Sequence, residues 1–168
     1  MSDIRSERMV GFVEKLLTVL MWLNWVCAGV IGALLAALII IPEQFVGNAG
    51  RDGITSETVT MVRIAMLIGL IMVPLAHVAL AKLKAIVASV RAGDPFVGAN
   101  AQRLTAIAWA LLGIMTCDLA FGYVSLVTDE QMGWSPSLTG WLAVLLLFVL
   151  ARVFDHGTRL RDEMEGTV

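Results

Sequence analysis

Few side chains in this sequence could perform acid–base, nucleophilic or metal chemistry. Such chemistry needs several His, Cys, Asp or Glu side chains that converge on one point. The two histidines, His77 and His156, lie far apart in the sequence, and Cys27 and Cys117 have no Cys or His neighbour at metal-ligand spacing. We therefore predict no catalytic, cofactor-binding or metal-binding residue, and we expect that the protein is not an enzyme.

Asp118 is the most informative polar residue, because it carries the single charge in the stretch 104–128. A carboxyl group in an apolar helix is costly and usually faces protein rather than lipid. At ~1.5 Å per residue it lies roughly 21 Å from the start of the stretch, near the expected level of Pro74. Two hypotheses stay open. Asp118 senses protons or a ligand, or it is a neutral acid that clips two helices together by donating to the Leu70 carbonyl, which Pro74 leaves unpaired.

His77 and Asn24 are the other polar side chains of interest within apolar stretches. His77 lies four residues before the end of its uncharged stretch, which places it only about 6 to 7 Å from the membrane edge. It is therefore too shallow to meet Asp118. We expect an interfacial histidine that is hydrogen-bonded to a neighbour such as Asn24.

The elements that hold these residues are long apolar segments. The chain is 58% hydrophobic and 15% charged, against about 45–50% and about 25% in soluble domains. A bilayer core of ~30 Å needs about 20 helical residues, and four uncharged or nearly uncharged segments approach that length: 16–41, 64–81, 104–128 and 132–151. We predict an all-α membrane protein, one domain over 1–168, with four transmembrane helices in an antiparallel bundle and a charged helical tail at 152–168. The first segment is too long for a signal peptide.

Orientation follows from the basic residues. Ten of the twelve Lys and Arg lie before the first span, between the second and third, or after the fourth: Arg5, Arg8, Lys15, Lys82, Lys84, Arg91, Arg103, Arg152, Arg159 and Arg161. Only Arg51 and Arg63 lie in the other two loops. Because such bias marks the cytoplasmic side, we predict that both termini and the loop around Gly93 are cytoplasmic.

Small residues recur every four positions in the first span at Ala28, Gly32 and Ala36. Such residues let two membrane helices approach closely. We predict a packing seam inside the bundle, and a homo-oligomer contact is the alternative. On either hypothesis this face should touch protein rather than lipid.

The middle loop carries good helix-boundary residues. Gly93 can end a helix in a left-handed conformation, Asp94 can cap the next one, and Pro95 suits its first position. The sequence therefore predicts that a helix restarts at Pro95. Phe96 would then be an apolar residue just outside the hydrocarbon, either in the interface or against a partner. The tail likewise places apolar Phe154 and Leu160 among charges of both signs.

Two short motifs resemble the bacterial domain-of-unknown-function 2975 family. They are Gly-Asp-Pro-Phe at 93–96 with Asn100, Arg103 and Leu104, and the closing pattern Val153, Phe154, Gly157, Leu160, Glu163, Glu165, Thr167 and Val168. The resemblance covers nearly the whole chain. It implies a small four-span protein of the bacterial inner membrane, often encoded beside an Xre-type helix-turn-helix regulator, and it carries over no catalytic residue.

The function expected on these grounds is that of a signalling or regulatory membrane partner, which sequesters or modulates a cytoplasmic helix-turn-helix regulator. The candidate contacts are Asp94, Pro95, Phe96, Asn100, Arg103, Phe154 and Leu160. The alternative is a small transporter, channel or complex subunit built around Asp118. The net charge of −2 argues against direct nucleic-acid binding, which needs a basic surface.

Overall fold

The chain folds into four long helices and, within the described residues, no strand. The structure is a computed structural model that describes residues 2–40, 56–94, 96–127 and 134–165. Its helices are α1 (Ser2–Ile40), α3 (Ser56–Arg91), α4 (Gly98–Val127) and α5 (Leu138–Glu165). Each is long and apolar enough to cross a bilayer. The predicted all-α architecture with four membrane-spanning helices is confirmed.

The helices extend beyond the uncharged segments, chiefly at the end that holds both termini. The 39 residues of α1 correspond to about 58 Å, nearly twice the ~30 Å hydrocarbon core. The charged tail is part of α5, and Arg63, which the sequence placed in a loop, lies inside α3. At its other end α5 begins at Leu138, later than the predicted segment 132–151, and Trp134–Ser137 are not helical. The Oγ of Ser137 accepts a hydrogen bond from the Gly140 amide at 3.2 Å, which caps this end.

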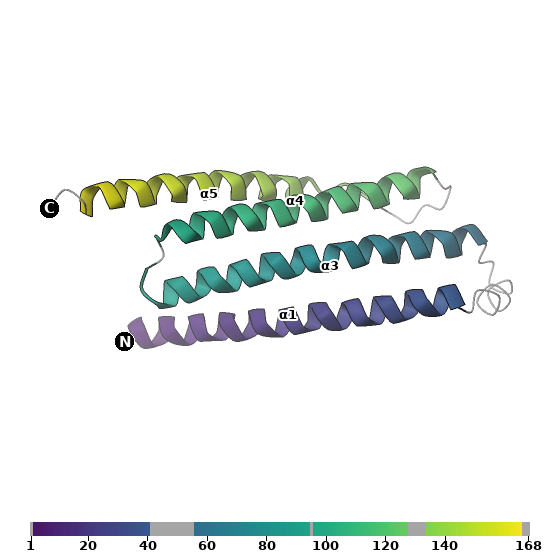
Figure 1. The fold of residues 1–168 in the computed structure, drawn as a ribbon, viewed down its shortest axis with the longest axis horizontal. Helices are drawn as coiled ribbons and strands as arrows, with labels where there is room; N and C mark the ends of the chain where they lie inside the picture. The colour runs from purple at the N-terminus through teal and green to yellow at the C-terminus, as the bar shows by residue number, and fades with distance from the viewer. Residues whose placement is uncertain (1, 41–55, 95, 128–133, 166–168) are drawn as a thin grey trace.

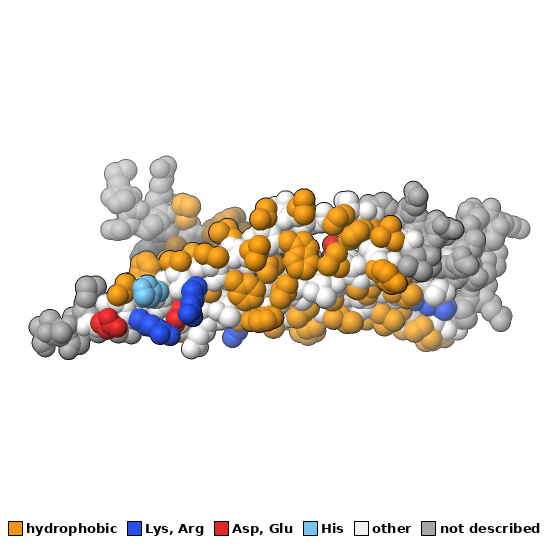
Figure 2. Space-filling view, turned by 90° about the horizontal axis from the view of Figure 1, so that it is seen from above, with side chains coloured by type: hydrophobic (Ala, Val, Ile, Leu, Met, Phe, Trp, Pro, Cys, Tyr) orange, Lys and Arg blue, Asp and Glu red, His pale blue; other side chains and the backbone are white. Residues whose placement is uncertain are grey.

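The helices pack in chain order, α1 against α3, α3 against α4 and α4 against α5. Both termini and the α3–α4 connection lie at one end of the molecule (Figure 1). Because α1 and α5 each have one main neighbour, much of their apolar surface is open, as at Trp22 (71% exposed) and Leu146 (67% exposed). Figure 2 shows hydrophobic side chains covering the middle of one face and charged side chains gathered toward its ends. This distribution is the one expected of a protein whose helices are surrounded by lipid along their middle part.

Close helix packing occurs at three glycines. A Cβ at Gly113 would lie 2.9 Å from the Leu75 side chain. A Cβ at Gly122 would overlap the indole of Trp134, and one at Gly140 would overlap Met115. These positions let α4 approach α3 on one side and the start of α5 on the other.

The small residues of α1 do not form the predicted seam within the chain. Among the described residues, no atom outside the local α1 backbone lies within 4 Å of a Cβ built at Gly32, and Ala36 is exposed. Ala28 is half-buried. The buried positions of α1 carry larger residues, among them Leu17 and Leu38, and α3 is the helix against which α1 packs.

The α3–α4 connection begins as predicted and continues differently. Gly93 has φ of +84°, and its amide donates to the Val90 carbonyl at 3.1 Å while the Asp94 amide donates to the Ser89 carbonyl at 3.2 Å. This pair of bonds is a Schellman cap. The predicted restart at Pro95 is wrong: α4 begins at Gly98, and Pro95 itself lies outside the described residues.

Candidate functional site: the loop–tail surface

The connection after α3 and the last turns of α5 meet at the end of the molecule that holds both termini. The rings of Phe96 and Phe154 stack with centroids 5.4 Å apart and planes inclined by 21°. The Arg161 guanidinium forms an ion pair with the Asp94 carboxylate at 2.8 Å. We call Asp94, Phe96, Phe154, Leu160 and Arg161 the loop–tail surface, since two segments about 60 residues apart in the chain build it together.

Helical spacing explains why these tail residues act together. Phe154 and Arg161 are seven residues apart, which is about two turns, so both point toward the α3–α4 connection. Val153 and Leu160 have the same spacing one position earlier, and they lie 60% and 49% exposed. The end of α5 therefore presents one stripe to the loop and an adjoining apolar stripe outward.

The surface keeps apolar area open within a charged setting. Phe96 is 52% exposed although it stacks on Phe154. The tail also holds an ion pair between Arg159 and Asp155 at 3.1 Å. Exposed aromatic and aliphatic side chains with a charged rim are typical of protein docking surfaces.

Asn100 and Arg103 serve a different role from the one expected. Asn100 is fully buried, so its side chain is not open to a partner. Its Nδ2 donates to the Ser89 Oγ at 2.7 Å, and its Oδ1 accepts from Arg103 Nη1 at 2.7 Å. Arg103 also donates to the Ala85 carbonyl at 3.2 Å. These residues hold the start of α4 against the end of α3, which positions the loop that carries Phe96.

Asp118 lies between α3 and α4, beside α3 residues that precede Pro74 in the chain, among them Met72, and not beside Pro74 itself. It borders a hollow of about 210 Å³ whose other lining residues are apolar or small, among them Gly69, Met72 and Phe121. Among the described residues its carboxyl group has no hydrogen-bond or ion-pair partner, so the expected bond to the Leu70 carbonyl is absent.

Asn24 and His77 lie together where α1 meets α3, but they do not bond to each other. Asn24 Nδ2 donates to the Val73 carbonyl at 3.0 Å, immediately before Pro74. The ring of His77 packs on Trp25 with centroids 5.4 Å apart, and its buried Nδ1 has no hydrogen-bond partner in the part of the chain that the structure describes. The backbone near the proline is thus bonded by an amide from α1 and not by Asp118.

One polar contact between α1 and α3 was not predicted from the sequence. Arg63 Nη2 donates to the Leu38 carbonyl at 2.7 Å, so α3 supplies a cation to the last turn of α1. That turn has unpaired carbonyls and a negative dipole end. The available signal was the position of Arg63 at the edge of an apolar segment. In the sequence analysis Arg63 entered only the prediction of orientation, and no contact with α1 was expected.

Metal chemistry finds no support in the described part of the chain. No group of three or more His, Cys, Asp or Glu there could hold a metal ion, and Cys27 and Cys117 are free thiols. The loop–tail surface offers aromatic packing and ion pairing between its described residues.

The comparisons with known proteins agree with the motifs on this surface. The model of the family described as "Protein of unknown function (DUF2975)" matches residues 14–168. The chain belongs to this family. The match includes the loop, the tail and all four helices apart from the first residues of α1. No curated protein and no solved structure matches the chain, so the family adds no activity to the geometry.

Proposed function

We propose that this protein is a regulatory partner in the bacterial inner membrane, with both termini in the cytoplasm, where its loop–tail surface captures a cytoplasmic protein. The supporting observation is the Phe96–Phe154 stack, which joins loop and tail into one surface while leaving Phe96 half-exposed. Aromatic side chains, Phe among them, are enriched in protein interfaces, and a few such anchors can dominate the binding energy.

The proposed partner is the Xre-type helix-turn-helix regulator that the family resemblance implies. A regulator held at the membrane has a lower free concentration at its operator, and release restores it. The exposed stripe of Val153 and Leu160 would bury apolar area on the partner. The Asp94–Arg161 pair would lie at the rim, where charges contribute specificity more than affinity.

The test is binding of the adjacent gene's purified regulator to the full-length protein in nanodiscs. Phe96→Ala and a chain ending at His156 should both weaken binding, by about tenfold or more if Phe96 is a hot spot. Phe12→Ala is the matched control, because Phe12 is an exposed phenylalanine (67%) on α1 outside this surface. Equal binding by the wild type and both altered surfaces would contradict the proposal.

Orientation is tested separately with a reporter that is active only in the cytoplasm. It should work after Val168 or within Arg91–Asp94, and it should fail near Asn48 or Glu130, by the basic-residue bias. Val168, Asn48 and Glu130 lie outside the described residues. A cytoplasmic signal from the Asn48 fusion would overturn the orientation and the proposed surface together.

A second candidate function is transport or conduction around Asp118. It rests on one observation, a carboxyl group without a partner among the described residues beside a hollow at membrane depth. If this function holds, Asp118→Asn should abolish proton or solute flux in liposomes while regulator binding persists. Flux that is the same in wild type and variant would leave the regulatory proposal alone.

A further inference from the structure

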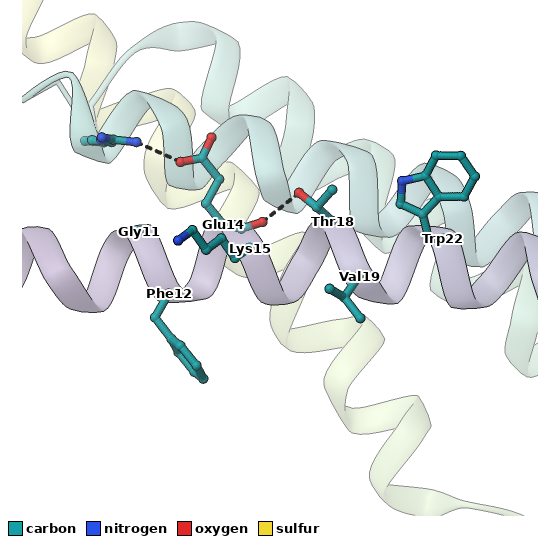
Figure 3. Close-up of a pocket in the computed structure, with 8 residues that line it drawn as sticks. Gly11, Phe12, Glu14, Lys15, Thr18, Val19 and Trp22 are labelled. Carbon is teal, nitrogen blue, oxygen red and sulfur yellow. Dashed lines mark hydrogen bonds and ion pairs between the residues drawn. The ribbon is translucent and has the colours of Figure 1, made fainter.

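A groove of about 890 Å³ runs along α1 near the end of the molecule that holds both termini. Its outer part carries Glu14 and Lys15 of α1 and Arg91 of α3, and its inner part carries Val19 and Trp22. In Figure 3 the Glu14 side chain reaches toward α3, while Lys15 lies in front of the α1 backbone. The groove thus joins a charged part to an apolar part.

The groove lies where a leaflet changes from headgroup to hydrocarbon. Lys15 is the last charged residue of α1, and positions 16–40 that follow it carry no charge. Trp22 is seven residues further along, about 10 Å deeper, and tryptophan is enriched at membrane interfaces. An occupant that fills the whole groove must therefore be polar at one end and apolar at the other.

The charges of the groove select the polar end of that occupant. Lys15 makes no ion pair or hydrogen bond with another described residue. Arg91 pairs with Glu14 through Nη1 at 2.9 Å, yet its side chain is 61% exposed and its other N–H groups are open to further acceptors. Two cations and one carboxylate leave the lining with one net positive charge, which favours an anion.

We propose that this groove binds an anionic phospholipid of the leaflet at the termini end. The headgroup phosphate accepts from Lys15 and Arg91, and an acyl chain lies along Val19 and Trp22. The Glu14 carboxylate stands beside the phosphate and opposes it, so the two cations are both needed. Basic pockets at helix boundaries are a recurrent way to hold acidic lipid headgroups.

The test is lipid retention by the full-length protein, measured by native mass spectrometry after titration with phosphatidylglycerol or phosphatidylcholine. Phosphatidylglycerol should bind more tightly. Lys15→Gln and Arg91→Gln should each weaken it about fivefold, the contribution of one basic side chain that meets an acidic headgroup. Lys82→Gln is the matched control, because Lys82 is exposed on α3 and does not line the groove. Lys15→Gln removes no hydrogen bond or ion pair to a described residue, so this variant should fold like the wild type, and a change in its lipid binding reports on the groove.

Two further arms separate other occupants. Glu14→Gln should tighten phosphatidylglycerol binding, because it removes the opposing charge and frees Arg91. Weaker binding of phosphatidylglycerol on Glu14→Gln would show that the Glu14 carboxylate does not oppose the headgroup phosphate and would overturn the proposed arrangement. Inorganic phosphate at millimolar concentration should not displace the lipid, since the acyl chain adds apolar contact. Displacement by phosphate, equal binding of both lipids, or equal loss with Lys82→Gln would each refute the proposal.

Discussion

Replacing Asn100 by Ala should loosen the junction between α3 and α4. Asn100 is fully buried and links two side chains, since its Nδ2 bonds Ser89 and its Oδ1 bonds Arg103, both at 2.7 Å. A neutral hydrogen bond contributes about 0.5–1.5 kcal/mol and one to a charged group about 1.5–3 kcal/mol. Ser89 and Arg103 each keep a second bond, to the Ile86 and Ala85 carbonyls. We therefore expect a loss near the lower limits, about 2 kcal/mol.

The assay is unfolding of the full chain in mixed micelles, followed by helical circular dichroism as the denaturing detergent fraction rises. Asn100→Asp keeps the bond from Arg103 and loses the donation to Ser89, so it should fall between wild type and Asn100→Ala. Gln102→Ala is the control, because Gln102 is exposed two residues further along α4. If Asn100→Ala and Gln102→Ala unfold within about 0.5 kcal/mol of each other, the buried network does not hold this junction.

Three more substitutions test the membrane part of the fold in the same unfolding assay. Gly122→Ala should destabilise by about 1–3 kcal/mol through overpacking against Trp134, whereas Gly29→Ala, where no atom lies within 4 Å, should be neutral or slightly stabilising. Asp118→Leu should leave stability unchanged or raise it, because the carboxyl group bonds no described residue. A loss of stability above about 1 kcal/mol would show that the Asp118 carboxyl group makes a stabilising contact.

The helical spans could be predicted because hydropathy is a local property. A run of about 20 apolar residues has to be helical in lipid whatever surrounds it. The ends of α1 and α3 could not, since the charged turns that extend these helices have the composition of a solvated loop. The left-handed Gly93 was predictable because glycine is the residue that adopts positive φ without strain.

Partners were harder to predict than conformations, because sequence spacing does not give the direction of a neighbour. Asp94 has the side chain of a helix cap, yet it pairs with Arg161 of α5, a contact that only the tertiary fold provides. The repeated small residues of α1 face open space at Gly32, while the isolated Gly113 and Gly122 are the points of close approach. Repetition was therefore a poor guide to packing here.

The loop–tail surface depends on more than its own residues. Helix α5 runs unbroken from Leu138 to Glu165, about 42 Å, and its start is held on α4 by Gly140 against Met115. The Trp109–Phe148 ring contact, with centroids 5.4 Å apart, also holds α5 on α4, six residues before Phe154. The position of Phe154 beside Phe96 therefore depends on the packing of α5 along α4. Asn100 fixes the loop that carries Phe96, and the α4–α5 contact fixes Phe154. A displacement of α5 along α4 would therefore change the contact between Phe154 and Phe96, and the close contact of Gly140 with Met115 would resist it.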